Sequence, residues 1–85
     1  MSLANAVYAL EELAEGRIPD QDRVLRGLNA LDPFLLQSGR DQDLHDAASM
    51  LELLLATGGA ASMLTEARSR AAAMAAAVRR LMVDG

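Results

Sequence analysis

Hydrophobic residues recur along this chain at spacings of three and four, which is the period of an α-helix. The first such segment runs from Ser2 to Gly16, with an apolar stripe on one face and Tyr8 and three glutamates on the other. Ser2 is a favourable N-cap, and glycine commonly ends a helix. The pattern therefore predicts an amphipathic helix whose buried stripe contains Leu3, Val7, Leu10 and Ala14.

A proline complicates the second predicted helix, which begins near residue 20. A proline inside a helix removes a backbone hydrogen bond and costs about 3 kcal/mol. Because Asp32 is a good N-cap and Pro33 a good first helical residue, we expect a break or kink there. A short turn should then run to Ser38. The stripe expected to be buried before the break consists of Val24, Leu28 and Leu31.

Two more helices complete the pattern. The third is expected from about Asp41 to Thr57, where Gly58 stops it. The last is expected from about Ala60 to Val83, with a heptad-like apolar seam. The sequence thus predicts an all-α fold, a small helical bundle of three long helices plus short turns. The last helix should be the longest and is rich in alanine.

Length and composition limit the fold further. The chain has 85 residues, which is one domain (1–85), and it contains few β-branched residues of the kind that sheets need. A sheet enzyme and a β-sandwich are therefore excluded. We expect Glu11, Glu15 and Arg80 to be exposed. The residues expected to be nearly inaccessible are Leu10, Leu28, Leu51, Leu55, Met74 and Val78.

The chain contains neither cysteine nor lysine. Disulfides, thiolate chemistry and cysteine zinc sites are thereby excluded. Arginine as the sole strong base, together with abundant alanine and leucine, indicates a bacterial gene rich in GC. The longest uncharged segment is too short and too interrupted for a membrane span, so we expect a cytoplasmic protein.

Charge is unevenly distributed along the chain, whose net charge is −4. Residues 1–66 hold eleven acids against four arginines, whereas residues 67–85 hold four arginines against one acid. We expect the basic last helix to lie on the acidic remainder of the bundle. The alternative is a nucleic-acid-associated regulator that uses Arg68, Arg70, Arg79 and Arg80, but the overall acidity and lack of aromatic residues oppose it.

The best candidates for chemistry are Asp41, His45 and Asp46. Asp41 precedes the only histidine by one helical turn, so the two side chains could share a metal or a proton. A metal site needs at least three converging ligands, and acids in a first helical turn serve as caps. We therefore expect no catalytic residue, metal or cofactor, and keep a small helical enzyme or ligand-binding domain using these residues as the alternative.

The polar faces of the last two helices carry more small and apolar residues than solvent exposure requires. Glutamate, lysine or arginine would normally occupy such positions on a monomer. We therefore expect a non-enzymatic protein–protein interaction module, such as a small adaptor, chaperone or regulatory subunit, that packs a helix face against a protein partner or a second copy. The expected interface residues are Leu53, Ala56, Ala72, Ala73, Ala76 and Arg80.

Overall fold

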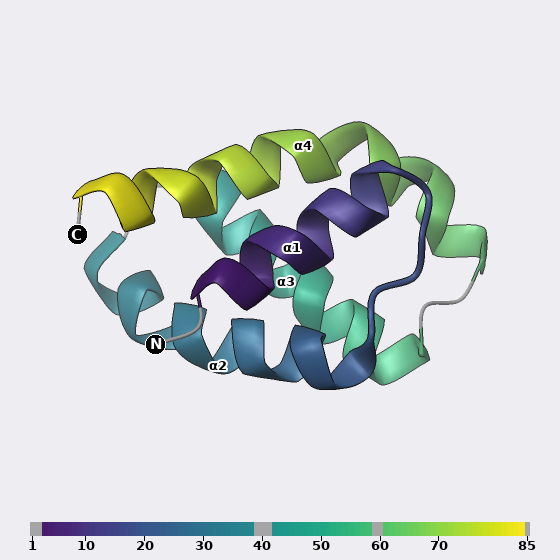
Figure 1. Ribbon diagram of the computed structural model, residues 1–85, viewed down its shortest axis with the longest axis horizontal. Helices are drawn as coiled ribbons and strands as arrows, with labels where there is room; N and C mark the ends of the chain where they lie inside the picture. Colours follow the sequence, from purple (N-terminus) through teal and green to yellow (C-terminus); the bar gives the residue numbers. More distant parts are fainter. Residues whose placement is uncertain (1–2, 39–41, 59–60, 85) are drawn as a thin grey trace.

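The computed structural model describes residues 3–38, 42–58 and 61–84, and every element in these ranges is a helix. The helices are α1 (Leu3–Ala14), α2 (Gln21–Ser38), α3 (Gln42–Thr57) and α4 (Ala61–Asp84). α1 crosses the front of the molecule between α4 and α2, and α3 lies behind it (Figure 1). α1 packs most extensively against α4, to which it runs antiparallel. The predicted all-α class is confirmed.

The described residues show no break at Asp32–Pro33 and no short turn after it, and they form four helices where three long helices plus short turns were expected. Pro33 lies inside α2, which continues to Ser38. Leu31 is fully buried, and Phe34 and Leu35 pack against the core one turn later. These side chains share one face of the helix, so their burial offsets the hydrogen bond lost at the proline.

The core confirms most of the predicted register. Leu10, Leu51, Met74 and Val78 are buried, as expected. Leu28 and Leu55 are only partly buried, because Gly27 and Leu54 occupy the positions closest to the core. Glu15 and Arg80 are exposed as predicted, whereas Glu11 is half-buried where it pairs with α4. None of the helices, over their described residues, is both long enough and apolar enough to cross a membrane.

The end of α1 follows a known capping geometry. Gly16 has a φ of +84°, its N–H donates to the Leu13 carbonyl at 3.0 Å, and the Arg17 N–H donates to the Glu12 carbonyl at 2.9 Å. This pair of bonds is the Schellman motif, which favours glycine because of the positive φ. The chain then turns with Pro19 buried and Ile18 exposed.

α1 and α2 approach each other most closely at Gly27. A Cβ atom at this position would lie 2.6 Å from the Ala6 nitrogen and 2.7 Å from the Ala6 Cα. Both atoms belong to the backbone of α1, so they can move only if the whole helix moves. The absence of a side chain at Gly27 therefore sets the spacing of the two helices.

We predict that Gly27→Ala destabilises the fold by about 1–3 kcal/mol, because the added methyl group overpacks this crossing. In an ordinary helix interior the same change is stabilising by up to about 1 kcal/mol. Urea unfolding measures the effect, with Asn29→Ala, at an exposed position of α2, as the control. A Gly27→Ala protein as stable as the control would contradict the close crossing.

We predict that Leu51→Ala lowers the free energy of unfolding by about 2–5 kcal/mol, since the side chain is fully buried and its removal leaves a cavity. Leu53→Ala is the matched control: it makes the same chemical change two residues later, at a side chain that is 45% exposed. Its cost should be well below that of Leu51→Ala. Equal losses in urea melts would show that the register of α3 is wrong.

Candidate functional site

The residues predicted as candidates for chemistry do not form a cluster in the structure. Asp41 lies outside the described residues, and His45 is partly buried on α3. Asp46 accepts a hydrogen bond of 2.9 Å from the Gln42 side-chain amide and forms an ion pair with Arg70 of α4. Across the described parts of the chain, no three histidine, aspartate or glutamate side chains gather as metal ligands would. Asp46 thus links α3 to α4.

The arginines of α4 make contacts with the acidic helices around them. Arg70 pairs with Asp46 of α3, and Arg79 pairs with Glu11 of α1. The Arg68 guanidinium lies close to Gly16, where a Cβ would be 3.0 Å from its Cζ atom. Exposed pairs of this kind contribute at most about 1 kcal/mol each. They place the basic last helix against acidic neighbours, as the charge distribution predicted.

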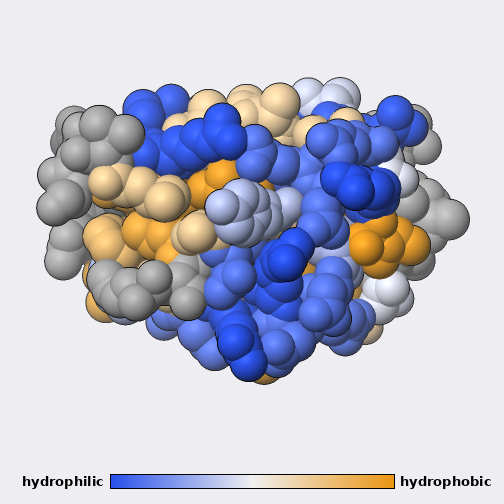
Figure 2. Space-filling model, in the orientation of Figure 1, coloured by the Kyte–Doolittle hydropathy of each residue, from blue (hydrophilic) through white to orange (hydrophobic). Residues whose placement is uncertain are grey.

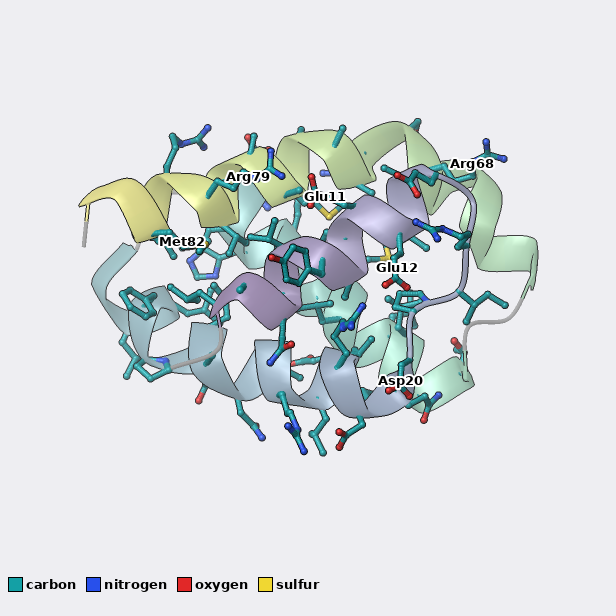
Figure 3. All side chains as sticks on the ribbon, viewed as in Figure 1. Glu11, Glu12, Asp20, Arg68, Arg79 and Met82 are labelled. Carbon is teal, nitrogen blue, oxygen red and sulfur yellow. The ribbon has the colours of Figure 1, made fainter. Side chains whose placement is uncertain are left out.

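An apolar hollow of about 270 Å³ opens between the first half of α1 and the last turns of α4. Tyr8 is 53% exposed at its edge and Met82 is 47% exposed. Figure 3 shows Arg79 and Met82 on the α4 side of this region. The hollow, as we call it below, is lined by Ala4, Val7, Tyr8, Arg79 and Met82.

A shallow groove of about 250 Å³ lies beside the hollow along the same pair of helices. Its floor is made of alanines from both helices, and Glu11, Glu15 and Arg79 form its rims. Arg79 belongs to both depressions, so they form one surface, which we call the α1–α4 face. Apolar colour is visible between charged residues on this side of the molecule (Figure 2). The alanines of the groove are Ala14, Ala72, Ala75 and Ala76.

Tyr8 is held in place by a contact with α2. The Arg23 guanidinium lies 5.8 Å from the centre of the Tyr8 ring, within the range of a cation–π interaction. The same guanidinium forms an ion pair with Glu12. Tyr8 therefore presents an ordered aromatic surface to solvent, at little cost in side-chain entropy when it is covered.

The structure places the six predicted interface residues on two separate surfaces. Ala72 and Ala76 line the groove, and Ala73 and Arg80 are exposed on the same helix outside the lining. Leu53 and Ala56 are exposed on α3 and belong neither to the hollow nor to the groove. Sequence reasoning missed Tyr8 and Met82. The available signal was a large aromatic residue on the polar face of the first helix.

We predict that His45→Ala leaves both metal response and stability nearly unchanged, since His45 has no converging ligands among the described residues. Thermal unfolding of wild type and variant with excess Zn²⁺ or Mn²⁺ measures this. The two proteins should show the same shift in Tm with each metal. A metal-dependent stabilisation that disappears in His45→Ala would instead indicate a metal site that uses this residue.

The comparisons with known proteins do not assign this surface. No protein-family model, no curated protein and no solved structure matches the chain. The function is therefore inferred from the contacts of this chain itself.

Proposed function

We propose that this protein is a non-enzymatic protein–protein interaction module, which acts by packing its α1–α4 face against a helical surface of another chain. The other chain is a protein partner or a second copy. The observation that supports this proposal is the hollow, where two large side chains, Tyr8 and Met82, remain about half exposed around an apolar floor.

The residue types around the hollow are those that interfaces favour. Tyrosine, methionine and arginine are enriched at protein interfaces, and all three are present here as Tyr8, Met82 and Arg79. Burying a fully exposed large apolar side chain contributes about 1.5–3 kcal/mol, so covering the half-exposed Met82 contributes about half of that. Two such side chains around one depression are enough to serve as the centre of a binding surface.

The groove beside the hollow suits a helical partner. Its alanines have no side chain beyond Cβ, so the backbone of a second helix can approach closely. The rims carry Glu11 and Glu15 on α1 and Arg79 on α4. Charges at the rim of an apolar surface set the register and orientation of a partner more than its affinity.

The proposal includes the roles expected from the sequence: a small bacterial adaptor, chaperone or regulatory subunit that works in the cytoplasm. It is preferred to an enzyme because Asp46, the described acid next to His45, is engaged by Arg70 and Gln42. It is preferred to a nucleic-acid-associated regulator because Arg70 and Arg79 both pair with carboxylates of the bundle.

We predict that a photo-crosslinking amino acid at position 8 forms a discrete protein adduct in cells of the native host. Tyr8 borders the hollow and is exposed, so an aromatic crosslinker fits there without disturbing the core. Gel electrophoresis and mass spectrometry identify the adduct. Untagged wild-type protein, expressed in excess, should compete with it, whereas the Ala76→Glu variant should compete poorly because the added carboxylate fills the groove.

The matched control carries the same crosslinker at position 29, an exposed site of α2 away from the α1–α4 face. It should give no discrete adduct. If position 8 yields no more adduct than position 29, or if Ala76→Glu competes as well as wild type, the proposed function is wrong.

A further inference from the structure

We propose that the α1–α4 face is the interface of a two-fold homodimer, in which Ile18 of each copy enters the hollow of the other. This inference rests on the proposed function and names the partner. It follows from two features: an exposed apolar side chain and an apolar depression at opposite ends of one side of the molecule, and an uneven distribution of charge along that side.

The projection is Ile18, in the connection between α1 and α2. Its side chain is 54% exposed, while the next residue, Pro19, is buried and anchors the connection. The connection follows the C-terminal end of α1, whereas the hollow adjoins its N-terminal half, so the two features lie at opposite ends of this helix. The connection runs along the side of the molecule seen in Figure 1, and Figure 2 shows apolar surface at both ends of this side.

A two-fold axis across the helices brings these two features together. The hollow adjoins Ala4, Val7 and Tyr8 of α1 and Ile18 follows the other end of this helix, so the point midway between them lies along the second half of α1. Rotation by half a turn about an axis through this midpoint exchanges the two ends of the face. Ile18 of each copy then lies over the hollow of the other, and the contact is made twice, as isologous interfaces require.

Charge selects this axis over the other two-fold arrangement. Arg79 lies where the hollow meets the groove, the exposed Arg80 follows it on α4 outside both linings, and Glu15 lies in the groove three residues before Ile18. An axis across the helices places the arginines of one copy near Glu15 of the other. An axis parallel to the helices would place arginine against arginine, which is unfavourable.

Glu15 can take part in such a contact because its existing ion pair is weakly held. It pairs with Arg17, two residues away, and the two side chains are 60% and 64% exposed. Pairs between exposed side chains have little net stability and exchange readily. An arginine from a second copy can therefore join or replace Arg17 at this carboxylate.

The side of the molecule that carries the face has the dimensions of a dimer interface. A stable interface buries about 800 Å² per partner, which is about one sixth of the 4955 Å² accessible surface of this chain. The widest side of the molecule measures 33 × 23 Å, and it carries the face. On its α4 side the groove presents the methyl groups of its alanines beside Arg79.

The test uses charge reversal and sedimentation equilibrium. We expect wild type to dimerise, and Arg80→Glu and Glu15→Arg each to dimerise about tenfold more weakly or worse, because each places like charges at both contacts. An equimolar mixture of the two variants should dimerise again, since both contacts then join opposite charges. The double variant Glu15→Arg/Arg80→Glu should also recover dimerisation on its own.

The apolar contact has its own variant and matched control. Ile18→Asp should weaken dimerisation about tenfold or more, because it places a carboxylate in the apolar hollow. Leu53→Asp makes a comparable change at a half-exposed leucine of α3, outside the face, and should leave dimerisation unchanged. Circular dichroism of each variant checks that the helices are intact.

A wild type that stays monomeric at high concentration would overturn this inference, as would charge-reversed variants that fail to complement each other. Together with a specific adduct of another protein at position 8, either result would leave the proposed function standing with a different partner. A monomeric wild type without any such adduct would overturn both.

Discussion

The structure depends on the close packing of α1 between α2 and α4. Gly27 lets the α2 backbone approach Ala6 so closely that a single added methyl group would overlap α1. On its other side α1 makes the most extensive helix contact of the molecule, with α4. Leu10 and Leu13 are fully buried as a result. A short amphipathic helix of 12 residues is marginal alone in water, so α1 owes its stability to these two neighbours.

The central position of α1 also explains the exposed surface. A helix packed from two sides buries a wide stripe but keeps one face in solvent, and here that face carries Tyr8, Glu11 and Glu15. α4 lies alongside and adds alanines, Arg79 and Met82. The hollow and the groove therefore exist because two amphipathic helices of different length lie antiparallel at the surface. Their ends do not match, and the side chains near the end of α4 only partly cover α1.

The ion pairs between helices follow the same arrangement. Arg79 with Glu11 and Arg70 with Asp46 join α4 to the helices on either side of it. Each pair is exposed and contributes little to stability. Their effect is on register, because a helix shifted by one turn would separate both pairs. Acidic side chains of the first three helices thus pair with arginines of the last helix within one chain.

Much of this protein is determined by local sequence. The period of apolar residues indicates an all-α chain, and Gly16 and Gly58, both at positive φ, end two of its helices. The outward position of Ala72, Ala73, Ala76 and Arg80 also follows from helical spacing, because each side chain has a fixed direction around the helix axis. Tertiary structure decided the rest. α2 continues through Pro33 because Leu31, Phe34 and Leu35 are buried together. The cost of the proline can be read from the local sequence, whereas the free energy gained by this burial depends on the other helices. The hollow at Tyr8 and Met82 joins residues 74 positions apart, and only the packing of α1 against α4 brings them to one surface.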